Sequence, residues 1–307
     1  MPWRIDELPD QTGRTILVTG CTVGGLGHHT ALELARRGAT VLLAGRNEPK
    51  LRQTEATILA EVPDARLGRV VVDLADLSSV RRAAASVDAV DVLVNNAGVM
   101  APPYSRTVDG FESQLGTNHL GPFLLTGLLL PLLAGAGEAG RDARVVTVSS
   151  LMHRTARSAP VEDPRTERRG HRRWQDYARS KLANLLFTFE LERRLTEHGL
   201  PVRALAAHPG FSGTHLVVNG QLGGTARIIP RTLSNGNTDY RVRISADDPA
   251  SLFLLERKRA LTKARTHYPV KRMIAKIELV DQRECQCISV QSTEHLYLTN
   301  NCAVTHN

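Results

Sequence analysis

The sequence predicts an α/β fold, a doubly wound parallel sheet with helices on both faces, followed by a small β-rich appendage. An apolar run from Arg14 to Gly20 has strand character, a glycine turn follows it, and a helical pattern continues to Gly38. A second strand from Thr40 to Ala44 completes a β-α-β unit. A chain of 307 residues with 42% hydrophobic content can bury the full core of such a fold.

The glycine turn from Cys21 to Gly27 is a candidate phosphate site. Glycines let the backbone pass close to a pyrophosphate, and the free N–H groups at a helix start attract its negative charge. A tight turn without a ligand is the alternative. The position of the turn inside the β-α-β unit favours the phosphate site.

Further strands are expected along the chain, and each is followed by polar or small residues. These strand ends are Asp73-Leu74 after Val70–Val72, Asn95 to Gly98 after Val92–Val94, Ser150 after a fifth strand, and Pro209-Gly210 after Leu205–His208.

Tyr177 and Lys181 stand four residues apart, a spacing that places both side chains on one face of a helix. The Lys181 ammonium can then favour the ionised form of the Tyr177 phenol. A phenol with an unperturbed pKa of about 10 is too weak an acid to exchange protons at neutral pH, so a lowered pKa would suit it to catalysis. Alone, the pair would be read as an exposed helical pair, because this spacing occurs often by chance; its place in an ordered series of motifs favours the catalytic interpretation.

Together, in this order, the motifs resemble the short-chain dehydrogenase/reductase family over roughly the first 215 residues. The family's glycine pattern is TGxxxGxG, and here four residues rather than three separate Gly20 from Gly25. The resemblance implies a Rossmann fold and a catalytic tetrad of Asn118, Ser150, Tyr177 and Lys181.

The resemblance also implies a role for each residue. Ser150 would hydrogen-bond the substrate oxygen, Tyr177 would exchange the proton, and Lys181 would bind the nicotinamide ribose, while Asn118 would hold a water beside Lys181. Without Tyr177 and Lys181, Ser150 would be an ordinary strand-end hydroxyl and Asn118 an ordinary polar helix residue. The residues expected at the cofactor are Thr19, Gly20, Gly25, Leu26, Gly27, Arg46, Asp73, Leu74, Asn95, Ala97, Gly98, Tyr177, Lys181, Pro209, Gly210 and Thr214.

The end of the second strand predicts the cofactor. An acidic residue there binds a ribose 2′-hydroxyl, whereas an arginine accommodates a 2′-phosphate. The sequence has Arg46 and no acidic residue at this strand end, which favours NADP(H) over NAD. A solvated arginine at the start of the next helix is the alternative.

The expected function is NADP(H)-dependent interconversion of a carbonyl and an alcohol on an apolar small molecule. The length of an arginine-rich stretch from Met152 to Trp174 and the run from Ser180 to Asn184 resemble the retinol dehydrogenase-like and protochlorophyllide reductase-like branches of the family. The arginines could bind an acidic substrate, but a solvated loop is the favoured interpretation. A cofactor-binding protein without turnover is an alternative function, and a homodimer through the helices bearing Asn118 and Tyr177 is compatible with the family.

Composition gives the remaining expectations. The net charge of +8 is spread along the chain, so nucleic-acid binding is not expected. Leu124 to Leu133 is too short to span a membrane, and Asp6, Glu7 and Asp10 interrupt any signal peptide, so we expect a cytoplasmic location. We expect no metal site, because Cys285, Cys287 and Cys302 lack a fourth ligand with conventional spacing.

The tail departs from the family. From about Leu233 the expected lid, helix and seventh strand are not found, so two domains are predicted, residues 1–233 and 234–307. Short β-like runs there resemble the C-terminal end of an intein, a family in which the terminal asparagine cyclises with help from the preceding histidine. The matching residues are His306 and Asn307, with His295 upstream. Protein splicing by this chain alone is not expected, because no N-terminal intein half is found. An ordinary β-rich appendage is the alternative.

Overall fold

The computed structural model describes residues 5–159 and 171–210, apart from the side chain of residue 6. Beyond them it describes the backbone of six strands, β7 (Ala226–Thr232), β8 (Thr238–Ile244), β9 (Ile274–Leu279), β10 (Gln286–Val290), β11 (Leu296–Leu298) and β12 (Val304–His306). The chain divides into two compact units, Met1–Ser212 and Gly213–Asn307, and each is described by itself.

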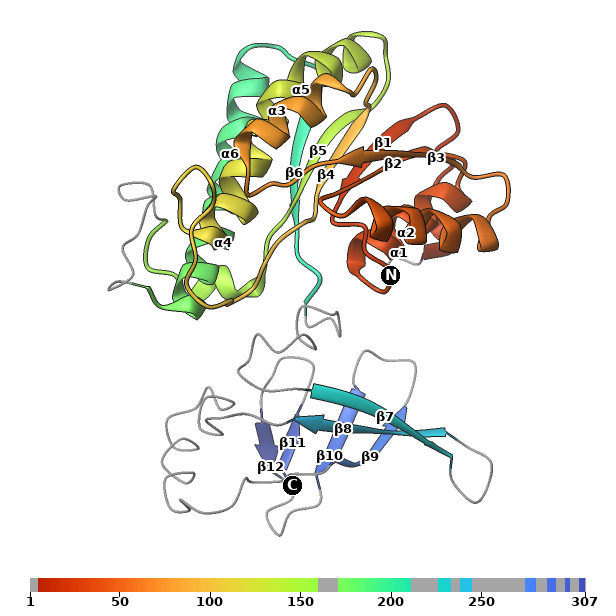
Figure 1. Ribbon diagram of the computed structural model, residues 1–307, viewed down its shortest axis with the longest axis vertical. Helices are drawn as coiled ribbons and strands as arrows, with labels where there is room; N and C mark the ends of the chain where they lie inside the picture. Colours follow the sequence, from red (N-terminus) through yellow and green to blue (C-terminus); the bar gives the residue numbers. More distant parts are fainter. Residues whose placement is uncertain are drawn as a thin grey trace. The chain divides into compact units, whose positions relative to one another are not determined.

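The first unit is built on a parallel sheet of six strands in the order β3-β2-β1-β4-β5-β6 (Figure 1). The strands are β1 (Thr15–Thr19), β2 (Thr40–Gly45), β3 (Arg66–Val71), β4 (Val92–Asn95), β5 (Ala143–Val148) and β6 (Val202–Ala207). The order reverses between β1 and β4, which pair in parallel with Leu17 beside Leu93. This confirms the predicted doubly wound fold, and such a reversal is where these sheets bind ligands.

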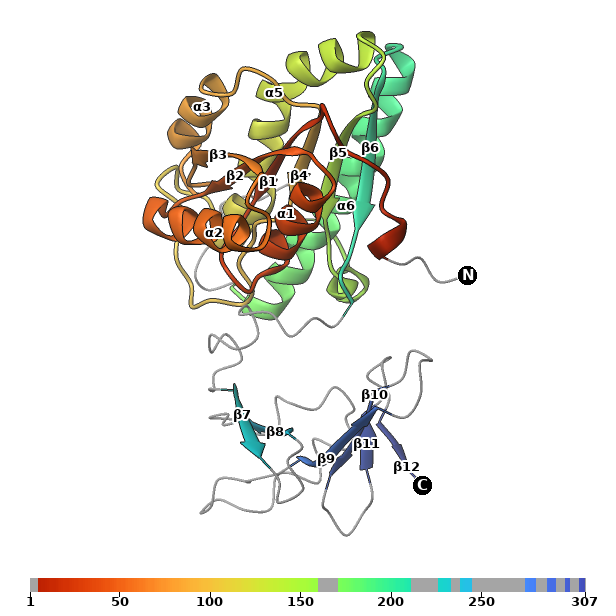
Figure 2. The same cartoon turned by 90° about the vertical axis from the view of Figure 1, so that its right-hand side faces the viewer.

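Helices cover both faces of this sheet. Two of them, α1 (Leu26–Arg36) and α2 (Glu48–Glu61), lie on one face, and α3 (Leu77–Ala85), α5 (Gly121–Glu138) and α6 (Arg173–Glu197) lie on the other (Figures 1 and 2). The shorter segments are η1 (Ile5–Glu7), α4 (Ser113–Leu115), η2 (Gly116–Leu120) and η3 (Leu151–Thr155).

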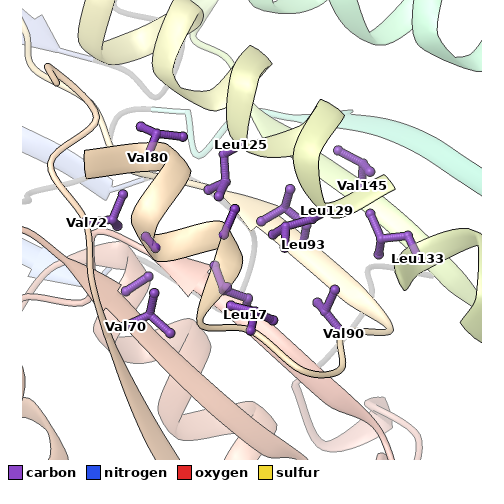
Figure 3. Close-up of a cluster of buried hydrophobic side chains, with 14 of the residues drawn as sticks. Leu17, Val70, Val72, Val80, Val90, Leu93, Leu125, Leu129, Leu133 and Val145 are labelled. Atoms are coloured by element: carbon purple, nitrogen blue, oxygen red, sulfur yellow. The ribbon is translucent and has the colours of Figure 1, made fainter. Parts of the chain in front are cut away.

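Each face of the sheet has its own hydrophobic core. On the α5 side, Leu125, Leu129 and Leu133 recur every four residues along the helix and pack against Leu17 and Leu93 of the central strands (Figure 3). On the other side, apolar residues of α1 and α2 cover Ile16, Val18, Val41, Leu43, Val92 and Val94. Central strands buried on both faces explain the nearly continuous apolar runs in the sequence.

The expectation that no stretch reaches the length of a membrane span is wrong. Leu124 to Leu133 is part of a longer helical run, Ser113–Glu138, because α4, η2 and α5 follow one another without a break. This run of 26 residues is long and apolar enough to cross a membrane, by length and composition alone. In the structure, one side of it forms the core described above.

In the second unit, the described strands are antiparallel. β7 and β8 form a two-stranded sheet, and β9 to β12 form a four-stranded sheet in the order β12-β11-β10-β9. The strands expected near Tyr240, Cys287, Leu296 and Val304 correspond to β8, β10, β11 and β12.

Candidate active site

The predicted site residues of the first unit lie where strands end. Thr19 closes β1 and Gly20 follows it, Asn95 closes β4, and Ser149 and Ser150 follow β5. Since all six strands are parallel, these ends share the carboxyl edge of the sheet. Thr214 lies outside the described residues, as does most of the arginine-rich stretch, residues 160–170.

The glycine turn accommodates its additional residue through left-handed glycines. Gly20 and Gly24 have φ values of +77° and +76°, a region that other residues rarely adopt. The Gly25 amide donates to the Thr22 carbonyl at 2.9 Å, and Gly25 then precedes α1 with extended backbone. Within the described residues, no side chain caps the start of α1, which leaves its first N–H groups available to a phosphate.

Close packing around this turn requires glycine at one further position. A Cβ added to Gly27 would lie 2.6 Å from the Gly20 carbonyl oxygen and 2.6 Å from the side-chain nitrogen Nδ2 of Asn96. The same Nδ2 of Asn96 donates to the Thr19 carbonyl at 2.7 Å. The Thr19 hydroxyl accepts from the backbone amides of Asn96 and Ala97. The strand ends of β1 and β4 are therefore tied together behind the turn.

Three other cofactor candidates lie at this edge in different surroundings. The Asn95 side chain is buried and donates to the Thr126 hydroxyl of α5 at 3.0 Å, so it supports the sheet from the α5 side. Arg46 is exposed directly after β2. Asp73 is half-buried, and its carboxylate accepts from the Ala75 amide at 2.9 Å.

Tyr177 and Lys181 are both buried on α6 and face the end of β5. The Lys181 ammonium lies 5.8 Å from the centre of the Tyr177 ring and donates to the Val148 carbonyl at 2.9 Å. The Ser150 side chain is close enough to the Tyr177 phenol to lower the phenol pKa as a hydrogen-bond partner. The structure thus brings Ser150, Tyr177 and Lys181 together from two elements that are distant in sequence.

Burial changes the acid–base properties of both groups. It raises the pKa of Tyr177 above its ordinary value of 10.0, and the hydrogen bond to Ser150 offsets only part of that rise. Burial also lowers the pKa of Lys181 from 10.5 to about 8. In the cofactor-free protein the net effect is a raised phenol pKa, because desolvation of Tyr177 outweighs the lowering by Ser150. That Lys181 favours the ionised phenol stays a prediction.

Asn118 lies in η2, a π-helical segment between α4 and α5. Its side chain amide donates to the Val99 carbonyl and to the Ser180 hydroxyl, both at 2.9 Å, and its oxygen accepts from the Val99 amide at 2.7 Å. A Cβ added to Gly98 would lie 3.0 Å from the Asn118 oxygen and 3.5 Å from the Lys181 nitrogen. Asn118 therefore joins the loop after β4 to the helix that carries Tyr177.

Sequence reasoning did not single out Ser180, Asn96 or Gln114, although each fixes part of this arrangement. Ser180 and Asn96 stand inside the recognised motifs, whereas nothing in the sequence marks Gln114. Pro209 and Gly210 follow β6 and are exposed. In the part of the chain with described side chains, no group of three His, Cys, Asp or Glu residues is arranged to hold a metal.

Comparison with known sequences gives consistent similarities. A profile described as short chain dehydrogenase matches residues 14–161. A polyprenol dehydrogenase of Mus musculus is 44% identical over 218 residues, which are 70% of this chain and 64% of that protein. Retinol dehydrogenase 13 of Homo sapiens is 43% identical over 208 residues, 66% of this chain and 60% of that protein. This chain therefore spans less than two thirds of either relative.

Solved structures support the same fold. An uncharacterised protein from Mycobacterium paratuberculosis superposes with a TM-score of 0.62 at 50% identity, covering 72% of this chain and 77% of that one. A candidate NAD(P)-dependent gluconate 5-dehydrogenase from Beutenbergia cavernae, solved with bound NADP, gives a TM-score of 0.54 at 28% identity, covering 68% and 77%. These comparisons lend no support to the intein resemblance of the tail.

The expectation of a cytoplasmic location is wrong. The relatives are named for retinol and polyprenol, which are lipid-soluble alcohols, and the run Ser113–Glu138 has the length and composition of a membrane span. The prediction failed because the lack of a recognised leader or span does not by itself indicate a location.

Proposed function

We propose that this chain, which matches the short chain dehydrogenase profile over residues 14–161, is a member of that family and interconverts a carbonyl and an alcohol by hydride transfer with NADP(H). The observation that carries the proposal is the grouping of Ser150, Tyr177 and Lys181 beside a glycine turn whose helix start is open to phosphate. Asn118 completes the proposed tetrad.

The residues present fit a dinucleotide. The glycine turn and the first turn of α1 would hold the pyrophosphate, Arg46 would pair with a 2′-phosphate, and Lys181 would bind the nicotinamide ribose. When bound, the nicotinamide supplies the hydride acceptor or donor. A neighbour that was solved with NADP supports a nicotinamide cofactor in general, and the preference for NADP(H) rests on Arg46.

The raised pKa of Tyr177 favours one direction at neutral pH. A phenol that stays protonated is ready to donate to a substrate oxygen, so Tyr177 would act as the general acid in carbonyl reduction. Ser150, which already bonds the phenol, would hold that oxygen in line with it. Lys181 with a pKa of about 8 remains largely charged at pH 7 and stabilises negative charge near the phenol as the proton leaves.

An apolar substrate is favoured by the names of the relatives. Retinol and polyprenol are both alcohols on long hydrocarbon chains, which supports an apolar aldehyde or ketone as the substrate class. The chain spans only 64% and 60% of these two relatives. We therefore propose a class of substrate for it and no single compound.

The decisive experiment pairs wild type with Tyr177→Phe. Purified protein is incubated with NADPH or NADH against a panel that includes retinal and long-chain aldehydes. Wild type should oxidise NADPH faster than NADH, and Tyr177→Phe should lose at least about 100-fold in kcat through loss of the acid, while its NADPH affinity is kept. NADPH binding without turnover of any carbonyl would instead indicate a cofactor-binding protein.

For residues 234–307 we propose a remnant of an intein C-terminal end, with 233/234 as the boundary of the family domain. The observation that favours it is the antiparallel pairing of the described strands, of which β12 includes His306. Asn307 and His295 lie outside the described residues. The test adds a short peptide beginning with cysteine after Asn307, mixes the protein with a complementary N-terminal intein fragment and follows the masses, with Asn307→Ala as control. Cyclisation of Asn307 breaks the peptide bond to the added segment and releases it. Retention of the segment by the wild-type fusion would reject the proposal.

A further inference from the structure

Three side chains of α4 and η2, the segments that precede α5, form hydrogen bonds to α6. The bonds join Gln114 to the Arg173 carbonyl at 2.9 Å, Asn118 to the Ser180 hydroxyl at 2.9 Å, and His119 to the Asn184 side chain at 3.1 Å. Asn118 belongs to the proposed tetrad, whereas Gln114 has no assigned role. Gln114 is also the member of this set that reaches the first turn of α6.

Both ends of the Gln114 amide are used. Its nitrogen donates to the Arg173 carbonyl, and its oxygen accepts from the Ala101 amide at 2.8 Å. Gln114 and Ala101 are both fully buried. Side-chain bonds at both ends in a buried setting hold the amide in one orientation, because an unpaired buried donor or acceptor is costly.

Ala101 adopts an unusual conformation that this bond supports. Its φ of +49° lies in the left-handed region, which a residue with a Cβ occupies at a cost of about 1–2 kcal/mol. Such strain persists where the surrounding structure holds it. The loop after β4, which also contains Gly98 and Val99, is thus fixed at Ala101 by Gln114 and at Val99 by Asn118.

The other end of the Gln114 amide contacts the helix that carries Tyr177. Arg173 is the first residue of α6, and Tyr177 follows four residues later. In an α-helix the amide of a residue donates to the carbonyl four residues before it, so the Arg173 carbonyl is the acceptor for the Tyr177 amide. The Arg173 carbonyl therefore accepts two hydrogen bonds, one from the Gln114 side chain and one from the Tyr177 amide.

We propose that Gln114 is a positioning residue for the reaction proposed above. Its amide fixes the first turn of α6 against the Ala101 turn, and this keeps the Tyr177 phenol within reach of Ser150. The inference rests on the proposed function, because the geometry it protects is that of the general acid.

Two substitutions separate the bonds. Gln114→Glu keeps the size and the acceptor for the Ala101 amide but, when ionised, has no donor for the Arg173 carbonyl. Gln114→Met removes both. Each should lower kcat by at least about tenfold, because small misplacements of a reacting group are costly, while NADPH affinity stays within about twofold. Gln53→Met, at an exposed position of α2, is the matched control and should leave kcat unchanged.

The Glu variant offers a rescue. Burial raises the pKa of a carboxyl group, and the protonated form regains a donor. The kcat of Gln114→Glu, divided by that of wild type at each pH, should therefore rise as the pH falls. For Gln114→Met the same ratio should stay flat. A ratio that is flat for both variants would contradict a role through the Arg173 bond.

A second readout does not depend on turnover. The Tyr177 phenol is titrated in cofactor-free protein by ultraviolet absorption, as the difference between each protein and the same protein with Tyr177→Phe. The interaction with Ser150 lowers the phenol pKa. If Gln114→Met moves Tyr177 away from Ser150, the midpoint of the phenol titration should therefore move upward.

The outcomes are distinct. If wild type turns over no carbonyl, the proposed function fails, and the phenol titration still tests Gln114. An unchanged midpoint together with kcat within twofold of wild type would overturn the positioning role. If neither variant folds, as judged by circular dichroism, Gln114 is required for folding and the positioning role is rejected.

Discussion

Replacing Lys181 with methionine should stabilise the cofactor-free protein while it abolishes turnover. Lys181 is 4% exposed, and burial lowers its pKa from 10.5 to about 8. At roughly 1.4 kcal/mol per pKa unit, this shift means that burying the charged lysine costs about 3 kcal/mol at pH 7. The hydrogen bond to the Val148 carbonyl is lost in the variant, which costs about 1–2 kcal/mol. The variant should therefore be more stable by about 1–2 kcal/mol at pH 7.

The pH dependence gives the sign of the effect. Below pH 8 Lys181 is charged in both the folded and the unfolded chain, so the full cost is present. As the pH rises from 8 towards 10.5, the unfolded chain binds more protons than the folded one, and the stability of wild type rises. The advantage of Lys181→Met over wild type should accordingly shrink between pH 7 and pH 9.5, by about 2 kcal/mol.

The assay is urea unfolding followed by circular dichroism, which reports the first unit because all the described helices belong to it. Lys50→Met, at an exposed position of α2, is the matched control and should show no advantage at either pH. If Lys181→Met is less stable than wild type at pH 7, or if its advantage does not change with pH, the reasoning from burial is refuted.

Three further predictions follow from the site. Arg46→Glu should reduce the preference for NADPH over NADH by about 10- to 100-fold, since it replaces a charge-assisted bond to phosphate with repulsion; the ratio of kcat/KM values measures this, and an unchanged ratio removes Arg46 from cofactor choice. Gly98→Ala should lower kcat by about tenfold, because the added Cβ would lie only 3.0 Å from the Asn118 side-chain oxygen and would displace it; stopped-flow turnover equal to wild type would contradict this. Alcohol oxidation should quicken with rising pH and carbonyl reduction should slow, because the raised pKa of Tyr177 keeps the phenol protonated at neutral pH; parallel initial rates from pH 6 to 10 that vary together would speak against Tyr177 as the exchanging group.

Much of the fold could be predicted from local patterns. The strand, glycine turn and helix at the N-terminus, and the four-residue spacing of Tyr177 and Lys181, depend on backbone periodicity and glycine conformation, which short segments of sequence encode. The additional residue of the glycine turn was visible in the sequence. The left-handed conformation of Gly24 in this turn, with φ of +76°, is known only from the structure.

Electrostatics and long-range contacts required the tertiary structure. The sequence placed an ammonium beside a phenol and suggested a lowered phenol pKa, but burial of Tyr177 by the surrounding fold raises it. Gln114 shows the same limit, because its partners Ala101 and Arg173 lie 13 and 59 residues away. Sequence by itself determined which groups occur and which neighbours share a helix face. Only contacts between distant segments decided how much water each group loses, because desolvation depends on every element that surrounds a group.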